Sequence, residues 1–292
     1  MFTGSMVALV TPFKNGRVDK KGLRALVKFH LQNGTDVICP CGTTGEAATL
    51  SLEEHEQVVN VVMDAAGGKV PVLAGTGSNN TAEALRLTKH AVRAGVAGCL
   101  LITPYYNRPT QDGLIAHFKK IAEAVDIPLV LYNVPGRTGV NMLPETVAKL
   151  ARLPNIVGIK EASGTLSQVS EIINLCSRDF SVVSGDDINT LPIMAVGGKG
   201  VISVTANIAP RLVSLMVRAF EQGRLDEAQR LHHHLIPLHN AMFLQTNPIP
   251  VKTALGLMGI ISSEMRLPMC SMPKELTEKL RGILKKYELV KA

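Results

Sequence analysis

Short apolar segments alternate along the chain with longer segments of helical periodicity. The apolar segments are rich in β-branched residues and are bounded by turn-forming residues, which is typical of strands buried on both faces. Candidate strands lie at 5–10, 37–39, 70–74, 98–102, 129–132, 156–160, 180–184 and 200–204. Because a helical pattern follows each candidate strand, this order predicts parallel strands joined by helices.

Capping residues support the helices between these strands. Asp19 precedes a segment with apolar residues at helical spacing, and Gly34 follows it. Ser51 with Glu54 forms a capping box, in which each residue can bond the other's backbone N–H group. We therefore expect helices to begin after Asp19 and Ser51.

Eight such strand–helix units predict a TIM barrel, an α/β fold in which all strand carboxyl ends meet on one rim. A doubly wound open sheet is the alternative. After about residue 223 the strand pattern stops, and helices are expected over 225–245, 251–258 and 273–287. We predict a catalytic barrel domain at 1–223 and a C-terminal helical domain at 224–292.

Composition narrows the class of protein. The chain has 292 residues and a net charge of +7, but its 31 basic residues are mixed with 24 acidic ones, so nucleic acid binding is not expected. No apolar segment approaches the length of a membrane span, which is about 18 residues, and there is no basic leader. The five cysteines form no CxxC pair, and we expect reduced thiols in a cytoplasmic protein.

Lys160 ends the apolar segment 156–160 and is the strongest candidate for chemistry. Burial disfavours the charged form of a lysine, and a neutral amine can attack a carbonyl group to form an imine. The ordinary alternative is a lysine that extends to solvent or pairs with Glu161. Other residues at strand ends must decide between these interpretations.

Polar residues follow several of the predicted strands. The segment 42–46, with sequence GTTGE, can present backbone N–H groups to an anion, or can simply be a tight turn. Tyr132 ends one strand, Arg137 follows it, and these side chains could transfer a proton and bind a carboxylate. Tyr105 and Tyr106 lie in a loop after another strand, where they indicate hydrogen bonding, an interface or plain packing.

Other motifs carry less weight. The segment 75–79 lacks the third glycine of a dinucleotide-binding motif, so no nicotinamide cofactor is implied. His232, His233 and His234 are consecutive, whereas helical metal ligands recur at i and i+4, so no metal is expected. The glycine-rich segment 197–200 precedes a strand, which places it on the wrong rim for a phosphorylated substrate.

Four motifs together resemble the dihydrodipicolinate synthases: GTTGE at 42–46, PYYNRP at 104–109, YNVPGRTG at 132–139 and GIKEASG at 158–164. The resemblance extends over essentially the whole chain. It implies a TIM barrel with a C-terminal helical domain, usually in a homotetramer built as a dimer of dimers. It also implies condensation of pyruvate with aspartate 4-semialdehyde on the route to lysine, with no metal or organic cofactor.

The resemblance assigns roles to individual residues. Lys160 would form the Schiff base with pyruvate, Tyr132 would be the general acid and base, and Thr43 would relay protons to Tyr106 of a partner subunit. Thr44 would hold the pyruvate carboxylate, and Arg137 the carboxylate of the aldehyde. Two further residues, Gly185 and Ile202, would line the pyruvate pocket.

Two alternatives remain open. N-acetylneuraminate lyase and the 2-keto-3-deoxy sugar acid aldolases are similar in fold and in the imine step, but Arg137 in the PGRTG motif favours a short dicarboxylic product. A non-catalytic binding protein on the same barrel is disfavoured, because it would not need Lys160, Tyr132, Thr43 and Tyr106 together.

The resemblance also implies a possible allosteric lysine site at the dimer interface. Its positions would be Ala48, His55, Asn79, Glu83 and Tyr105. Leu52 stands where strongly inhibited relatives have a histidine, and Ala47 where they have a serine. We therefore expect weak or absent inhibition by lysine.

Overall fold

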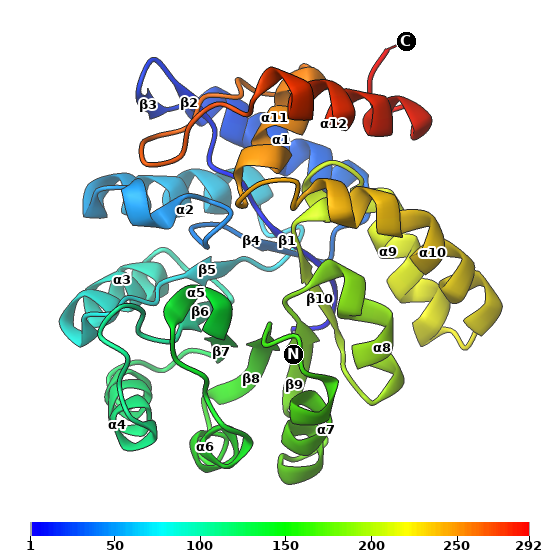
Figure 1. Ribbon diagram of the computed structural model, residues 1–292. Helices are drawn as coiled ribbons and strands as arrows, with labels where there is room; N and C mark the ends of the chain where they lie inside the picture. The colour runs from blue at the N-terminus through cyan, green and yellow to red at the C-terminus, as the bar shows by residue number, and fades with distance from the viewer. Residues whose placement is uncertain (1, 292) are drawn as a thin grey trace.

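A closed barrel of parallel strands forms the body of the protein. The computed structural model describes residues 2–291. Its eight-stranded sheet has the order β4-β1-β10-β9-β8-β7-β6-β5, and a bridge between Ile38 and Val72 joins the two edges (Figure 1). The strands are β1 (Gly4–Ala8), β4 (Val37–Cys39), β5 (Leu73–Gly75), β6 (Gly98–Ile102), β7 (Leu129–Asn133), β8 (Ile156–Glu161), β9 (Ser181–Ser184) and β10 (Gly200–Ser203). The predicted TIM barrel is confirmed, and the open-sheet alternative is wrong.

Helices surround the barrel and follow its strands. They are α1 (Lys20–Gln32), α2 (Leu52–Ala66), α3 (Thr81–Arg93), α4 (Gln111–Ala122), α5 (Pro135–Thr138), α6 (Pro144–Leu150), α7 (Leu166–Leu175), α8 (Thr190–Ala195) and α9 (Pro210–Glu221). The Asp19 side chain caps α1 by accepting from the N–H groups of Lys21 and Gly22, and both bonds of the Ser51–Glu54 capping box are present. Both predicted helix starts are therefore confirmed.

A small hairpin was not predicted. Strands β2 (Phe13–Lys14) and β3 (Arg17–Val18) pair antiparallel across Asn15 and Gly16, which both have positive φ. Asn-Gly is a strong signal for a two-residue hairpin turn, so the sequence did carry this information.

Two apolar clusters stabilise the barrel. The larger one lies between the strands and the surrounding helices, and the smaller one fills the barrel interior with residues such as Met6, Leu73 and Val130. Phe2 belongs to the interior cluster, and its ring lies against Gly98, where an added Cβ would meet the ring at 2.5 Å. The Ser181 hydroxyl donates to the Phe2 carbonyl at 2.6 Å. These contacts place Phe2 at the N-terminal ends of β6 and β9.

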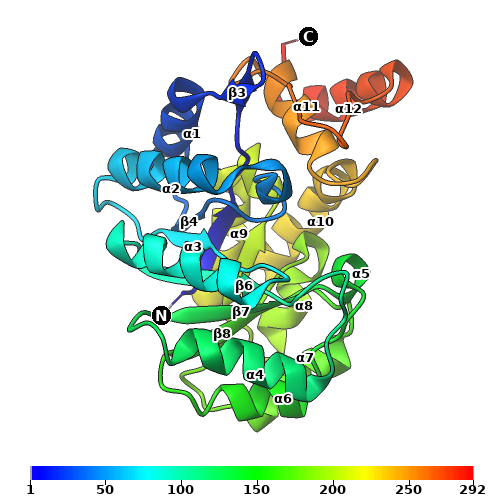
Figure 2. The ribbon, with the colours of Figure 1, turned by 90° about the vertical axis from the view of Figure 1, so that its left-hand side faces the viewer.

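The C-terminal segment adds three helices: α10 (Leu225–Ala241), α11 (Ile249–Leu257) and α12 (Lys274–Lys286). Helix α10 ends at Ala241, earlier than the predicted residue 245. Figures 1 and 2 both show the segment between α11 and α12 beside the β2–β3 hairpin. The Glu264 carboxylate of this segment accepts from the hairpin N–H groups of Asn15 (2.9 Å) and Gly16 (2.5 Å). The C-terminal extension therefore packs on the barrel. The division at residue 223 stays a prediction.

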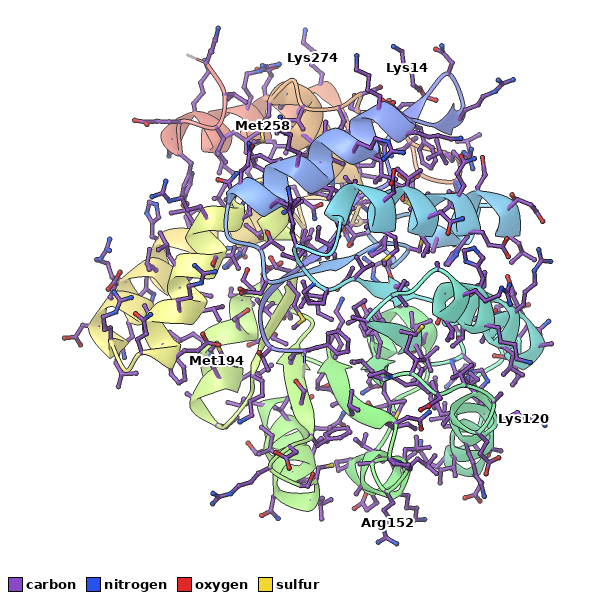
Figure 3. The ribbon with its side chains drawn as sticks, turned by 180° about the vertical axis from the view of Figure 1, so that it is seen from behind. Lys14, Lys120, Arg152, Met194, Met258 and Lys274 are labelled. Atoms are coloured by element: carbon purple, nitrogen blue, oxygen red, sulfur yellow. The ribbon has the colours of Figure 1, made fainter. Side chains whose placement is uncertain are left out.

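Charged side chains lie mainly on the outside. The labelled Lys14, Lys120, Arg152 and Lys274 in Figure 3 point away from the ribbon at its periphery. No helix within residues 2–291 is both long enough and apolar enough to cross a membrane.

Candidate active site

Tyr132 and Lys160 lie side by side at the carboxyl ends of neighbouring strands. They are register partners in the parallel pair β7–β8. Lys160 is 6% exposed and Tyr132 is 7% exposed, and the Lys160 Nζ lies 4.2 Å from the centroid of the Tyr132 ring. The strand ends thus place a buried amine and a phenol together, as the sequence predicted.

A cavity of about 390 Å³ opens above Lys160 at this rim. Seven of the residues that the sequence assigned to the reaction line it: Thr43, Thr44, Tyr132, Arg137, Lys160, Gly185 and Ile202. Thr43 and Thr44 follow β4, Tyr132 lies on β7 and Arg137 follows it. Lys160 lies on β8 and Ile202 on β10, and Gly185 directly follows β9. The structure therefore brings these seven residues to one site.

The Lys160 amine has no polar partner. It forms no hydrogen bond or ion pair with any residue in the range 2–291. The space for its side chain depends on Gly185, because a Cβ at that position would lie 2.9 Å from the Lys160 Cε and 2.7 Å from the Ala162 Cβ. An unpartnered buried amine facing a cavity is available for reaction with a bound carbonyl compound.

Burial also raises the pKa values of two neighbouring groups, the Cys39 thiol and the Asp186 carboxyl group. Cys39 lines the cavity, and burial raises the pKa of its thiol to about 12, although the nearby Lys160 opposes this shift. Asp186 lies at the rim, where burial raises the pKa of its carboxyl group and Asp187 adds to the effect. The Cys39 thiol is therefore a neutral part of the wall and not a competing nucleophile.

Asn247 is a site residue that the sequence interpretation missed. Its Nδ2 donates to the Thr44 Oγ1 at 2.9 Å, and its carbonyl oxygen accepts from the Arg137 Nη2 at 3.4 Å. With Asn240 and Phe243 it brings the C-terminal segment into the cavity wall. The Asn-Pro-Ile-Pro sequence at 247–250 falls in the break expected between the helices 225–245 and 251–258. Nothing in it indicates the contact with Thr44, which lies 203 positions away.

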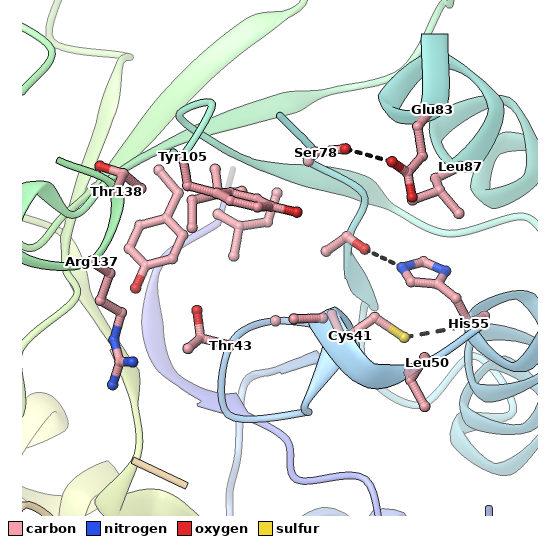
Figure 4. A pocket seen from close by; sticks show the side chains of 18 residues that line it. Cys41, Thr43, Leu50, His55, Ser78, Glu83, Leu87, Tyr105, Arg137 and Thr138 are labelled. Atoms are coloured by element: carbon pink, nitrogen blue, oxygen red, sulfur yellow. Dashed lines mark hydrogen bonds between the residues drawn. The ribbon is translucent and has the colours of Figure 1, made fainter. Parts of the chain in front are cut away.

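A second cavity, of about 340 Å³, adjoins the first (Figure 4). Four of the five predicted lysine-site residues line it: Ala48, His55, Glu83 and Tyr105. In Figure 4, Thr43, Tyr105 and Arg137 lie on one side of the cavity, and His55 and Glu83 lie on the other. Thr43, Tyr132 and Arg137 line both cavities, so the two spaces share a wall.

Hydrogen bonds hold the polar residues of the second cavity. His55 Nε2 is 2.7 Å from the Gly75 carbonyl, and burial lowers the pKa of this histidine. Glu83 accepts from the Ser78 hydroxyl at 2.8 Å. Asn79 is not among the lining residues, and its carbonyl accepts from the Asn107 side chain at 3.0 Å.

Tyr106 lies outside both cavities of this single chain. It is 90% exposed and has a φ of 72°, a left-handed conformation that is uncommon for an aromatic residue. The structure thus does not bring Tyr106 to Thr43 or Tyr132 of the same chain.

Comparison with known proteins identifies the family. A family model described as the dihydrodipicolinate synthetase family matches residues 1–287. The chain belongs to this family. A relative from Syntrophus aciditrophicus named 4-hydroxy-tetrahydrodipicolinate synthase is 56% identical over 290 residues, which are 99% of this chain and 100% of the relative. A relative of the same name from Geobacter sulfurreducens is 58% identical over the same shares of both chains.

Solved structures of the dihydrodipicolinate synthetase family agree. The dihydrodipicolinate synthase of Aquifex aeolicus matches with a TM-score of 0.98 at 49% identity, covering 99% of both chains. The enzyme from Acinetobacter baumannii, described as complexed with pyruvate, matches with a TM-score of 0.97 at 46% identity over 99% of this chain and all of the other.

The three consecutive histidines lie on α10. Within residues 2–291, no three His, Cys, Asp or Glu side chains gather in a group that could hold a metal ion.

Proposed function

We propose that the chain is a 4-hydroxy-tetrahydrodipicolinate synthase that condenses pyruvate with L-aspartate 4-semialdehyde. The observation that carries this proposal is the buried, unpartnered Lys160 amine beside the Tyr132 ring, in a cavity that also contains Arg137. The names of the full-length relatives support the same activity.

The reaction begins at Lys160. Its amine attacks the pyruvate ketone carbon, and loss of water gives an imine that withdraws electrons from the neighbouring methyl group. Loss of a methyl proton then gives an enamine, whose carbon attacks the aldehyde carbon of the second substrate. Since the imine supplies the electron sink, the reaction needs no metal or organic cofactor.

Two groups are placed to bind the substrate carboxylates. The hydroxyl of Thr44 is held by Asn247 and can bind the pyruvate carboxylate, with Gly185 and Ile202 forming the surrounding wall. The Arg137 guanidinium lines the same cavity and can bind the aldehyde carboxylate through two parallel hydrogen bonds. The charge of Arg137 favours this substrate over the sugar acids of sibling aldolases.

We assign proton transfer to Tyr132, with Thr43 relaying protons to Tyr106 of a partner subunit. The exposure of Tyr106 and its absence from its own chain's cavities support a role across an interface, in a homotetramer built as a dimer of dimers. A related structure is described as the first monomeric dihydrodipicolinate synthase variant, which implies that oligomers are usual among these enzymes. We place the enzyme in the cytoplasm, since Cys39, Cys41, Cys99, Cys176 and Cys270 are free.

The decisive experiment is reductive trapping. Incubation with pyruvate and borohydride, followed by peptide mass spectrometry, should place the pyruvate-derived mass on Lys160. A substrate panel read by product mass would then compare aspartate 4-semialdehyde with sugar aldehydes. Absence of an adduct in folded protein would contradict the imine mechanism and return the non-catalytic interpretation to first place.

The second cavity is a candidate lysine site lined by Ala48, His55, Glu83 and Tyr105; the fifth predicted residue, Asn79, lies outside its lining. Leu52 and Ala47 replace two polar contacts, so we expect inhibition by lysine to be weak or absent. A titration of activity with lysine up to millimolar concentrations checks this, and Leu52→His is the variant expected to increase inhibition. Strong inhibition of the unmodified enzyme would contradict the prediction.

A further inference from the structure

A buried polar network lies directly outside the barrel wall at the candidate active site. Asn133 follows Tyr132 on β7, and Glu161 follows Lys160 on β8; Asn133 and Glu161 are themselves register partners. Side chains alternate between the two faces of a strand, so Tyr132 and Lys160 face the cavity while Asn133 and Glu161 face the helices. Asn133 is 0% exposed and Glu161 is 1% exposed.

Glu161 is a buried carboxylate held by neutral donors. It accepts from Asn133 Nδ2 at 3.1 Å, from Gln168 Nε2 at 3.2 Å and from the Ser163 N–H group at 2.6 Å. No cation within residues 2–291 forms an ion pair with it. A buried carboxylate that loses such donors is strongly penalised, so these bonds constrain the elements that supply them.

Asn141 completes the network. Its Oδ1 accepts from Asn133 Nδ2 at 2.7 Å and from Gln168 Nε2 at 3.1 Å, while its Nδ2 donates to Gln168 Oε1 at 2.8 Å. The Met142 N–H group donates to Asn133 Oδ1 at 3.0 Å. We call Asn133, Asn141, Glu161 and Gln168 the amide cage.

The amide cage contacts the elements that carry Lys160, Tyr132 and Arg137. Asn133 and Asn141 stand at the two ends of the segment 134–140, which contains Arg137. Glu161 fixes the end of β8 beside Lys160, and its bond to Asn133 joins this strand to β7 beside Tyr132. Helix α7 supplies Gln168 from outside. One set of hydrogen bonds therefore connects the supports of Lys160, Tyr132 and Arg137.

We propose that the amide cage is a positioning device for the reaction, in which the buried Glu161 carboxylate sets the relative placement of Lys160, Tyr132 and Arg137. None of its members is a catalytic residue, because Asn133, Asn141, Glu161 and Gln168 do not line the reaction cavity. The inference rests on the proposed function, since it presumes an imine at Lys160. A network that served stability alone would, when weakened, change melting temperature without changing the reactivity of Lys160 in folded enzyme.

The first test is Glu161→Gln. This variant keeps the shape of the side chain but places an NH₂ group among amide donors, so at least one hydrogen bond is lost. Misplacement by about 1 Å can slow a reaction by roughly 100-fold. At a temperature well below unfolding, we expect the rate of borohydride trapping on Lys160 and kcat to fall by about 10- to 100-fold. The KM for the aldehyde should rise, because Arg137, which we assign to the aldehyde carboxylate, is displaced as well.

The second test is rescue by exchange. In Glu161→Gln/Gln168→Glu, the carboxylate moves to position 168, where it can accept from the Asn141 Nδ2 and from the new amide at 161. The bond that Gln168 donates to the Asn141 Oδ1 is lost, so the rescue is partial. The oxygen of that amide can still accept from Asn133 and from the Ser163 N–H group. We expect borohydride trapping on Lys160 to be about tenfold or more faster in this double variant than in Glu161→Gln. A double variant no better than Glu161→Gln would contradict the proposal.

Asn155→Asp is the matched control at the other end of β8. Asn155 Nδ2 donates to the carbonyls of Ala122 (2.9 Å) and Val125 (3.0 Å), far from the cage along the strand. This variant should lower the melting temperature and leave the trapping rate on Lys160 unchanged. If it slows trapping as much as Glu161→Gln does, the effect is general destabilisation and the proposal fails.

The remaining outcomes distinguish failure of this proposal from failure of the proposed function. If Glu161→Gln does not fold, Gln168→Met removes one donor at the edge of the cage and should slow trapping about three- to tenfold; an unchanged rate would overturn the proposal. An unchanged rate in folded Glu161→Gln would do the same. Failure to trap any adduct on the unmodified enzyme would instead contradict the proposed function.

Discussion

Two lysines are buried within residues 2–291, and their surroundings differ. Lys160 is 6% exposed and Lys252, on α11, is 0% exposed. Each amine lies over an aromatic ring, at 4.2 Å from the Tyr132 centroid and 4.3 Å from the Phe13 centroid. Burial and an aromatic neighbour are therefore common to both sites.

Their polar partners differ. The Lys252 amine donates to the Glu46 carboxylate at 2.5 Å and to the Thr11 carbonyl at 2.9 Å. Burial lowers the pKa of Lys252, and the Glu46 charge opposes this effect. Lys160 has no such partner and adjoins a cavity instead. Burial alone does not distinguish a reactive lysine from a structural one; the missing partner and the adjacent space do.

Replacing Lys160 should have the largest effect on activity and little effect on stability. Lys160→Met removes the amine to which we assign imine formation, so we expect activity to fall on the order of 1,000-fold or more. Its side chain has no hydrogen bond to lose, so the melting temperature should stay equal or rise. Steady-state kinetics measures the loss of activity, and calorimetry measures the melting temperature. A large fall in melting temperature would contradict the view that Lys160 has no structural role.

Replacing Lys252 should show the opposite pattern. Lys252→Met leaves the Glu46 carboxylate buried without its partner, which costs about 3–5 kcal/mol of unfolding free energy. Denaturant unfolding measures this cost. In the double variant Glu46→Met/Lys252→Met the loss should be smaller than the sum of the single losses, and strict additivity would show that the pair is not coupled.

Crowding Lys160 tests the space around its side chain. Gly185→Ala places a methyl group 2.9 Å from the Lys160 Cε, so the amine must shift. We expect kcat to fall about 10- to 100-fold. Gly282→Ala in α12 is the control, because an added Cβ there meets nothing within 4 Å, and it should keep full activity.

His30 extends the comparison to a third buried base. Burial lowers its pKa to about 3, so the folded protein keeps this ring neutral. Between about pH 6.5 and pH 3 the unfolded chain binds a proton that the folded chain does not, and stability falls as the pH falls. At pH 5 the loss is about 2 kcal/mol. Denaturant unfolding at pH 7 and pH 5 should show a smaller difference for His30→Gln.

The strands were predictable because their apolar residues are contiguous in sequence. The segment 156–160 is an example, since its β-branched residues and flanking turns needed no information from elsewhere. The Ser51–Glu54 capping box is equally local. Lys160, Tyr132 and Arg137 could be assigned to one site because parallel strands bring their carboxyl ends together.

Contacts between distant segments were not predictable in the same way. Asn247 reaches Thr44 across 203 positions, and the Glu161 donors come from β7, α7 and its own loop. The Asn15-Gly16 hairpin is different, because its turn signal is local and is contained in two adjacent residues with positive φ.

The position of β1 in the sheet has a consequence for how the protein is made. This strand pairs with β4 and also with β10, and its Gly4 is in register with Gly200. Pairing of segments so distant in sequence is entropically costly and slow, because a long loop must close first. During synthesis β1 can pair with β4 early, but its other edge stays unpaired until β10, near the end of the barrel sequence, has left the ribosome. Until that closure, the enclosed cavity between Ala8, Lys160 and Ile202 does not exist, and the half-built chain lacks the site that we assign to the reaction.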